Sequence, residues 1–290
     1  MKVLVTGAGG QLGTALRQIA PEGWLFSDVA GDFLHLDITD AAAVNAAVES
    51  YGIDVIVNCA GYTNVEGAED APSAAMLLNG TAPGILADAM KKVGGLIVHI
   101  STDYIFGGEK VTEPLKEDAT TAPLSAYGLS KLRGEEAVKA SGGNYVILRT
   151  AWLHSPWGKN FVKTILELTS KRDSIKVVND QTGTPTYAPD LASAIITVLD
   201  KYSAGIPCCG IYNYTDEGIT SWYEFACEIA RLSGNTSCKI VPCSTSDFPT
   251  KAVRPAYSVL DKTLVKETFG IEIPRWEESL RRCISAILES

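Results

Sequence analysis

Residues 2–13 read KVLVTGAGGQLG, and this stretch decides the fold. The apolar run before Gly7 is typical of a buried parallel strand, and glycines at 7, 10 and 13 follow it as G-x-x-G-x-x-G. In such a turn the first glycine permits a tight bend, the second lets the backbone approach a pyrophosphate, and the third lets helix pack on strand. A helix is expected over residues 14–19, and its free N–H groups would face the phosphates. We therefore predict a dinucleotide-binding site at the amino terminus.

Further apolar runs repeat this strand-and-helix unit along the first half of the chain. Strands are expected at residues 24–28, 54–61, 96–100 and 144–149. Because these runs do not alternate in polarity, they indicate strands that are buried on both faces. We predict an α/β fold with a Rossmann-type doubly wound parallel sheet in residues 1–150, to which later segments return. Residues 151–290 are expected to form mainly a smaller carboxyl-terminal substrate-binding domain.

Asp28 ends the second expected strand, fifteen residues beyond Gly13. A carboxylate at this place accepts hydrogen bonds from the adenosine ribose hydroxyls. Because it would also repel a 2′-phosphate, the sequence favours NADH over NADPH without excluding either. The alternative is that Asp28 only ends a strand or caps a turn. Asp37 is a candidate contact for the adenine edge, and Asp40 is expected to cap the next helix.

Small residues and hydroxyls follow the next two strands. Gly61 comes where small residues let a backbone lie against a flat cofactor, although it could merely make a turn. Tyr62 and Thr63 then begin a loop that is expected to cover the nicotinamide half of the cofactor. Ser101 and Thr102 follow the strand at 96–100, at the sheet edge where open α/β sheets bind their ligands.

Tyr127 and Lys131 stand four residues apart in a stretch that is expected to be helical. Side chains at this spacing share one helical face, so the phenol and the ammonium are predicted to be neighbours. A nearby cation favours the phenolate, and we expect it to lower the pKa of Tyr127 towards the range of an acid or base. Chance alone could also produce such a pair, since the chain has eleven tyrosines.

The second half of the chain offers weaker signals. Trp152 and Trp157 lie close together in a loop that follows a strand end, where a substrate would sit, but a packing lid or a partner contact would look the same. Lys251 and Arg254 lie in a later loop and could meet a phosphate group, although solvated charge is the commoner role of such residues.

Composition excludes several classes of function. The net charge is −9 and the chain has no run of Lys or Arg, which argues against nucleic-acid and anionic-membrane partners. Seven cysteines form no Cys-x-x-Cys pair and the three histidines are scattered, so no metal site is expected. The first apolar run is far too short for a signal peptide or a membrane span, and we expect a cytoplasmic protein.

The conjunction of these motifs resembles the extended short-chain dehydrogenase/reductase superfamily. It combines the glycine turn, the small strand end, a hydroxyl at 101 or 102, and Tyr127-x-x-x-Lys131. Within that superfamily the chain closely resembles the dTDP-4-dehydrorhamnose reductases, and the likeness covers nearly its whole length. The runs that carry it are HISTDYIF (99–106), YGLSK (127–131), RTAW (149–152), GKNF (158–161), NDQTGTPT (179–186) and Arg254-Pro255.

This resemblance implies reduction of the 4-keto group of dTDP-4-dehydro-β-L-rhamnose to dTDP-L-rhamnose with NADPH or NADH. It implies that Tyr127 donates the proton, that Lys131 holds the cofactor ribose and lowers the tyrosine pKa, and that Thr102 bonds the same oxygen. The cofactor contacts that it implies are Gly7, Gly10, Gln11, Leu12, Gly13, Asp28, Asp37, Ile38, Gly61, Tyr62, Thr63, Tyr127 and Lys131. The substrate contacts that it implies are Thr102, Asp103 and Trp152, with Asn160, Gln181 and Arg254 as further candidates for the nucleotide portion.

The resemblance has one departure and leaves two alternatives. Some members of the family carry a glutamate near the start of the first helix that helps to bind magnesium and form a dimer, whereas this sequence has Ala15. A metal-bridged dimer is therefore not implied, and a homodimer stays open. The alternatives are a nucleotide-sugar epimerase or dehydratase of the same superfamily, and a non-catalytic regulatory subunit with this fold.

Overall fold

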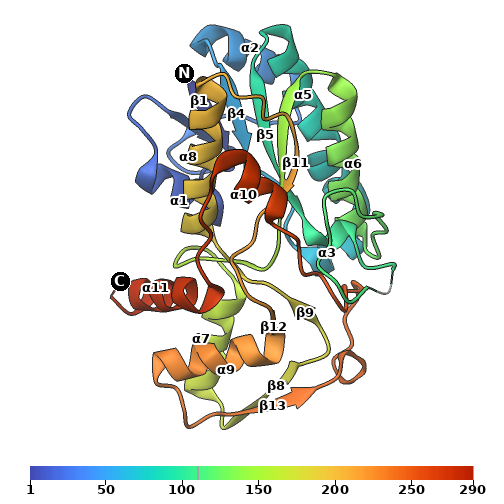
Figure 1. Cartoon of the computed structure of the whole chain (residues 1–290), viewed down its shortest axis with the longest axis vertical. Coiled ribbons are helices and arrows are strands. Elements are labelled where there is room, and N and C mark those ends of the chain that lie inside the picture. Colours follow the sequence, from blue (N-terminus) through green and yellow to red (C-terminus); the bar gives the residue numbers. More distant parts are fainter. Residues whose placement is uncertain (110, 290) are drawn as a thin grey trace.

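The computed structural model describes residues 1–109 and 111–289, which form two stacked lobes (Figure 1). Within these residues a sheet of seven strands occupies the upper lobe. Its strands are Val3–Thr6 (β1), Leu25–Asp28 (β2), Leu34–His35 (β3), Val55–Asn58 (β4), Leu96–Thr102 (β5), Asn144–Thr150 (β6) and Gly210–Asn213 (β11). Their spatial order is β11-β6-β5-β4-β1-β2-β3, and every neighbouring pair is parallel. The predicted Rossmann-type doubly wound fold is confirmed.

Helices cover both faces of this sheet (Figure 1). The helices on one face are α1 (Gln11–Ile19), α8 (Ala188–Ser203) and α10 (Thr263–Phe269), and those on the other are α2 (Ala41–Tyr51), α5 (Ala82–Lys92) and α6 (Ala126–Ser141). In β1, Val3 and Val5 belong to the first core and Leu4 to the second. Successive strand side chains point to opposite faces, so an unbroken apolar run is what a doubly covered strand requires.

The strand order places a ligand site at one edge of the sheet. From β1 the chain winds outward through β2 to β3, then crosses to β4 on the other side of β1. This reversal is the topological switch point, where loops leave the carboxyl ends of β1 and β4 in opposite directions and open a crevice. The glycine-rich turn follows β1 directly, so the fold delivers it to that crevice.

The helical segment over residues 72–92 contains an irregular turn. It consists of α4 (Pro72–Ala75), the π-helix η1 (Met76–Thr81) and α5. Pro83 lacks the N–H that would bond the carbonyl of Asn79 in an α-helix, so the regular ladder cannot continue through this point. Such single π turns often occur at functional sites. The predicted cap of α2 is confirmed, since Asp40 accepts hydrogen bonds from the amides of Ala42 and Ala43 at 2.9 and 3.0 Å.

The lower lobe is built from residues after β6 and has its own apolar core. Its helices are α7 (Phe161–Lys171), α9 (Trp222–Ser233) and α11 (Trp276–Leu288), and its parallel strand pair is β8 (Ser174–Val178) with β13 (Lys239–Cys243). Two further short pairs are β7 (Leu153–His154) with β10 (Thr186–Tyr187) and β9 (Thr182–Gly183) with β12 (Thr220–Ser221). Two 3₁₀ turns, η2 (Asp103–Ile105) and η3 (Thr245–Asp247), and the short helix α3 (Val65–Asp70) complete the described elements. The segments 188–203 and 210–213 run back into the upper lobe.

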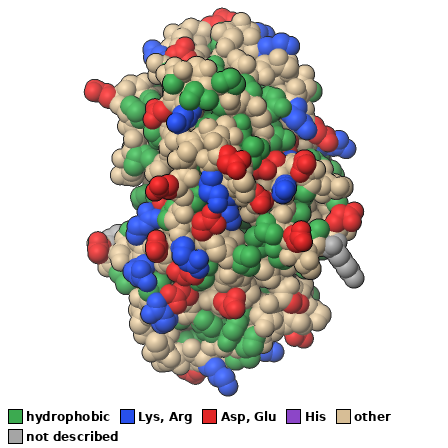
Figure 2. Space-filling model, in the orientation of Figure 1, with side chains coloured by type: hydrophobic (Ala, Val, Ile, Leu, Met, Phe, Trp, Pro, Cys, Tyr) green, Lys and Arg blue, Asp and Glu red, His purple; other side chains and the backbone are tan. Residues whose placement is uncertain are grey.

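The surface carries charges of both signs. On the face shown in Figure 2, acidic and basic side chains are intermingled, and neither sign forms a continuous field there. None of the described helices is long and apolar enough to cross a membrane. No cluster of three or more histidine, cysteine or carboxylate side chains suited to a metal ion occurs in residues 1–109 and 111–289.

Candidate active site

A cavity of about 840 Å³ lies at the carboxyl ends of the central strands, between the two lobes. The predicted site residues that line it are Gly7, Gly10, Gln11, Leu12, Asp28, Asp37, Ile38, Gly61, Tyr62, Thr63, Thr102, Asp103, Tyr127, Lys131, Trp152 and Asn160. Gly13, Gln181 and Arg254 are not among its lining residues. The fold thus gathers residues from across the sequence into one hollow of the size that ligand pockets have.

The glycine-rich turn has the shape of a phosphate cradle. Gly7 has a φ of +69°, and a Cβ there would lie 2.6 Å from the amide nitrogen of Ala60. A Cβ at Gly13 would lie 2.3 Å from the carbonyl oxygen of Gly7, so Gly13 works by packing and need not reach the cavity. Gly10 lines the cavity and caps α1 without a side-chain hydrogen bond, which leaves the first amides of the helix free for an anion.

The carboxylate of Asp28 is already engaged in shaping this turn. Its two oxygens accept hydrogen bonds from the amides of Gly9, at 3.0 Å, and Val29, at 2.8 Å. Turn capping, one of the two interpretations of Asp28, is therefore present in the structure. The side chain also lines the cavity, and no Lys or Arg occurs in residues 29–33 that follow it. A negative charge without a neighbouring cation in sequence is poorly suited to a 2′-phosphate.

Thr102, Tyr127 and Lys131 converge on the cavity from two elements. Thr102 ends β5, while Tyr127 and Lys131 lie one turn apart at the start of α6. Ser125 caps this helix by accepting a hydrogen bond from the amide of Gly128, and Glu69 of α3 accepts one from the amide of Ala126. The position of Tyr127 is thereby fixed from both sides of the helix start.

The predicted lowering of the Tyr127 pKa is wrong for the protein without ligands. Burial raises the pKa of Tyr127 to about 12, with Asp103 adding to the rise and the hydrogen bond to Thr102 opposing it. The ammonium of Lys131 donates instead to the carbonyl oxygen of Ile100. Loss of water around the phenol disfavours its charged form, and residue spacing in the sequence does not reveal this effect. Tyr127 is therefore held as a protonated hydroxyl, the form that can donate.

A buried ion pair lies behind Lys131. Arg149 of β6 binds Glu135 of α6 through two hydrogen bonds of 2.9 and 2.8 Å, and Ser101 of β5 donates to the same carboxylate at 2.5 Å. This group ties β6 to β5 and α6, the two elements that carry Thr102, Tyr127 and Lys131. Burial lowers the pKa of Lys131 to about 8, and the charge of Glu135 opposes that fall.

Asp103 and Tyr104 form the wall beside the tyrosine. Asp103 is 2% exposed and its Oδ2 has no hydrogen-bond partner. Burial raises the pKa of Asp103 to about 6, against hydrogen bonds from Ser258 and Thr102. The ring of Tyr104 meets that of Tyr127 edge to face, with 5.4 Å between centroids. Asp103 and Tyr104 therefore place a buried carboxyl group and an aromatic ring beside the phenol of Tyr127.

Sequence reasoning missed Asn79, which lies in the π-helix and lines the cavity. Its Oδ1 accepts from the amide of Tyr62 at 2.7 Å, while its Nδ2 donates to the Tyr62 carbonyl and to Ser130 Oγ, both at 3.0 Å. Asn79 therefore fastens the loop at Tyr62 to the helix of Tyr127. The sequence signal that could have pointed to it is Pro83, which interrupts a regular helix four residues later.

Trp152 is part of the cavity wall rather than a free surface ring. It has a φ of 49° and stacks on Trp222 of α9, with ring centroids 3.6 Å apart. Trp222 also lines the cavity and was not predicted. The positive φ of Trp152 is uncommon in a bulky residue and is found where surrounding structure enforces it. Separately, Asn160 donates to the side chain of Gln11 at 3.0 Å, which joins the lower lobe to the glycine-rich turn.

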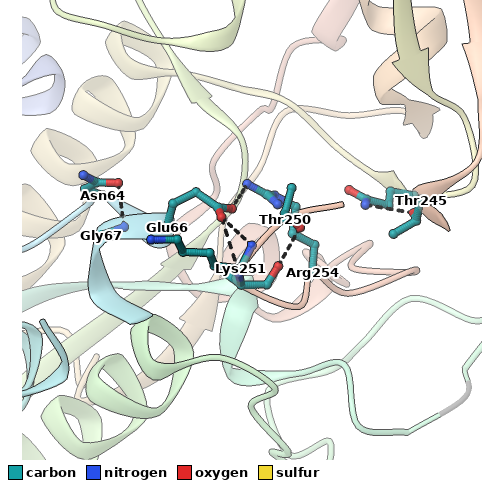
Figure 3. Close-up of polar contacts among 9 residues, drawn as sticks. Asn64, Glu66, Gly67, Thr245, Thr250, Lys251 and Arg254 are labelled. Carbon is teal, nitrogen blue, oxygen red and sulfur yellow. Dashed lines mark hydrogen bonds and ion pairs between the residues drawn. The ribbon is translucent and has the colours of Figure 1, made fainter. Parts of the chain in front are cut away.

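Gln181 and Arg254 have protein partners outside the cavity lining. Gln181 donates to Thr245 Oγ1 at 3.1 Å, and Arg254 donates to Glu66 Oε1 at 2.5 Å (Figure 3). Figure 3 also shows that the backbone amide of Lys251 donates a hydrogen bond to Glu66, the glutamate that binds Arg254. The nucleotide contact predicted for these two side chains stays a prediction.

Comparisons with known proteins agree on one family. Residues 1–289 match the family described as the RmlD substrate binding domain. The chain is 42% identical to a dTDP-4-dehydrorhamnose reductase of Burkholderia thailandensis over 99% of each chain. A dTDP-4-dehydrorhamnose reductase structure from Clostridium acetobutylicum is 42% identical and covers 100% of each chain, with a TM-score of 0.92. The Bacillus anthracis enzyme of the same name, in complex with NADP, is 36% identical over 100% of this chain and 99% of that one, with a TM-score of 0.90.

Proposed function

Because this chain belongs to the dTDP-4-dehydrorhamnose reductase family, we propose the residue roles by which it reduces the 4-keto group of dTDP-4-dehydro-β-L-rhamnose to dTDP-L-rhamnose with NAD(P)H. One observation carries the proposal. A protonated phenol, a threonine hydroxyl and an ammonium line a single cavity beside a glycine-rich phosphate cradle. These are the groups that a carbonyl needs when it accepts hydride and becomes an alcohol.

Tyr127 is the general acid in this proposal. Its raised pKa keeps the proton on the phenol at neutral pH, so that it can pass to the keto oxygen as negative charge develops there. Thr102 bonds the same oxygen and orients the phenol. The reduced nicotinamide, when bound, supplies the hydride. Lys131 holds the ribose of the cofactor, and its positive charge assists release of the proton from Tyr127 once the ligands have replaced water.

The cofactor cradle follows the amino-terminal motif. Gly7, Gly10, Gln11 and Leu12 hold the pyrophosphate, with Gly13 behind them. Asp28, Asp37 and Ile38 meet the adenosine end, while Gly61, Tyr62 and Thr63 meet the nicotinamide half. The turn suits glycine at position 10, because a Cβ there would lie 3.3 Å from the Gly7 carbonyl oxygen, closer than an ordinary contact. The carboxylate of Asp28 favours NADH, and NADPH remains usable.

The substrate side lies towards the lower lobe. Asp103 and Trp152 contact the sugar, and Asn160 meets the nucleotide from the loop before α7. Asp103 lines the cavity, and the stacked pair of Trp152 and Trp222 offers an apolar wall. Gln181 and Arg254 stay candidates for the nucleotide portion. To bind it, Gln181 would have to share or break its hydrogen bond to Thr245, and Arg254 its bond to Glu66.

The decisive experiment is to mix the purified protein with dTDP-4-dehydro-L-rhamnose and NADPH or NADH, and to follow cofactor absorbance and product identity. We expect one cofactor oxidised for each dTDP-L-rhamnose formed. An epimerase or dehydratase would return the hydride and consume no cofactor, so isomerised or dehydrated sugar without net oxidation would overturn the proposal. A regulatory subunit would show neither reaction.

We also propose a cytoplasmic location and leave a homodimer open. All seven cysteines are free thiols in the structure, which suits a reducing compartment. Sedimentation with and without magnesium would test whether Ala15, in place of the family's glutamate, goes with a monomer or with a dimer that needs no metal.

A further inference from the structure

A segment of the lower lobe, residues 250–258, crosses to the upper lobe beside the active site. We call it the strap. At its carboxyl end the amide of Ser258 donates to the carbonyl oxygen of Thr182 at 2.8 Å, and Tyr257 pairs with Thr182 in a β-bridge. At its amino end the strap docks on α3 of the upper lobe (Figure 3). The strap is therefore attached to both lobes.

Glu66 of α3 binds the amino end of the strap through its carboxylate. Its Oε1 accepts from the guanidinium of Arg254 at 2.5 Å, and its Oε2 accepts from the amides of Lys251 and Ala252 at 2.8 and 3.4 Å. Burial raises its pKa, but these donors outweigh burial and hold the pKa of Glu66 below its ordinary value. Charge-assisted bonds to a carboxylate are about twice as strong as neutral ones, so Glu66 holds the strap more firmly than an uncharged residue would.

The strap also contacts the wall of the cavity. The guanidinium of Arg254 lies close enough to the phenol of Tyr104 to oppose the rise that burial gives its pKa. Tyr104 lines the cavity and meets the ring of Tyr127 edge to face. Ser258, at the other end of the strap, hydrogen-bonds the carboxyl group of Asp103. A chain of contacts thus runs from Glu66 through Arg254 to Tyr104, and from there to the side where the substrate would bind.

The position of α3 explains why this chain concerns the substrate side. The helix begins directly after the loop at Tyr62 and Thr63, and Glu69 on the same helix accepts a hydrogen bond from the amide at the start of α6 at 2.8 Å. One short helix therefore fixes both the strap and the helix that carries Tyr127. The phosphate cradle instead follows β1 and is shaped by Asp28 of β2, the strand on the other side of β1 from β4.

We propose that Glu66 is a positioning residue for the nucleotide sugar: by docking the strap it holds Arg254 against Tyr104, and so sets the affinity of the substrate side without taking part in the reaction. This inference rests on the proposed function for the identity of the ligand. It differs from a direct role of Arg254, because the effect of Glu66 is predicted to pass entirely through the arginine.

The first test is the affinity of the Glu66→Gln variant for dTDP-L-rhamnose, measured by calorimetry. We expect the Kd to rise about three- to tenfold, which is the range for a partly exposed charged hydrogen bond, while the Kd for NADPH and the kcat change by less than about twofold. The matched control is Asp70→Asn on the same helix. The Asp70 carboxylate binds the exposed ammonium of Lys251 and not the backbone of the strap or Arg254, so this variant should leave all three quantities unchanged.

A double-mutant cycle tests whether Glu66 acts through Arg254. The double variant Glu66→Gln/Arg254→Gln should bind dTDP-L-rhamnose no more weakly than Arg254→Gln alone. Additive losses, an equal loss of NADPH affinity, or an effect of Asp70→Asn as large as that of Glu66→Gln would each overturn the proposal.

Hydrogen exchange separates a failure of this inference from a failure of the proposed function. The amide of Lys251 is bonded to Glu66, so residues 250–254 should exchange faster in Glu66→Gln than in the unaltered protein or in Asp70→Asn, with no ligand present. Unchanged exchange would overturn the docking role whatever the enzyme reduces. Faster exchange in a protein that binds no dTDP-sugar would instead refute the proposed function and, with it, the affinity role.

Discussion

The ion pair behind the helix of Tyr127 and an ion pair at the strap differ in how deeply they are buried. Arg149 and Glu135 lie behind the helix of Tyr127 with side chains only 3% and 1% exposed. Lys251 and Asp70 tie the strap to α3 with side chains 62% and 61% exposed. Water screens the second pair, whereas the first is desolvated and its carboxylate also accepts a hydrogen bond from Ser101. Burial therefore makes the Arg149–Glu135 pair part of a fixed frame, whereas exposure leaves the Lys251–Asp70 pair a weak contact.

The largest expected effect is on the buried pair. Arg149→Met keeps the apolar stem but leaves the Glu135 carboxylate in the core without its cation, and we expect a loss of about 3–5 kcal/mol in the free energy of unfolding. Urea denaturation measures it. The double variant Glu135→Gln/Arg149→Met, in which no charge remains, should recover much of that loss. A single-variant loss below about 1 kcal/mol would mean that depth does not distinguish the two regions.

The next largest effect is on the pH dependence of catalysis, and it depends on Lys131, which lies next to the buried ion pair. Its pKa is lowered to about 8 by burial, and the proposed mechanism uses the charged form, which is present below that pH and lost above it. Since kcat/KM reports the free enzyme, we expect it to fall about tenfold per pH unit above pH 8. Tyr127 has a pKa of about 12 and stays protonated in this range, so it does not add a second fall to the profile. A flat profile up to pH 10 would contradict this role of Lys131.

The smallest effect is on the exposed pair. Asp70→Asn should change the free energy of unfolding by less than about 0.5 kcal/mol, because solvent already screens the Lys251 ammonium. Thermal and urea unfolding of the same preparation would measure it. A loss comparable to that of Arg149→Met would show that the strap is as much a part of the frame as the core pair.

The parts of the site that the sequence predicted are those set by short spacings. The glycines at 7, 10 and 13 and the pair Tyr127 and Lys131 each lie within one turn or one helix face, and local geometry alone brings them together. The apolar runs of β1, β4 and β5 predicted the doubly wound sheet in the same way. Boundaries were less certain, since β4 ends at Asn58 and β5 continues through Thr102.

What the sequence could not predict depends on tertiary partners. Arg254 and Glu66 are 188 positions apart, and Trp222 comes from a helix far along the chain from Trp152, so no spacing signals either contact. The Tyr127 pKa was predicted in the wrong direction because helical spacing shows a nearby cation but not the burial that outweighs it. Asn79 depends on a π turn whose only local cue is Pro83.

Single-turnover reduction by Tyr127→Phe tests most directly whether this phenol donates the proton. The variant keeps the ring that packs against Tyr104 and removes one hydroxyl. We expect the rate of dTDP-4-dehydro-L-rhamnose reduction to fall by about 10²–10⁴-fold, the usual contribution of a general acid, with the Kd for NADPH unchanged. A rate within tenfold of the unaltered enzyme, at the same cofactor affinity, would contradict the account.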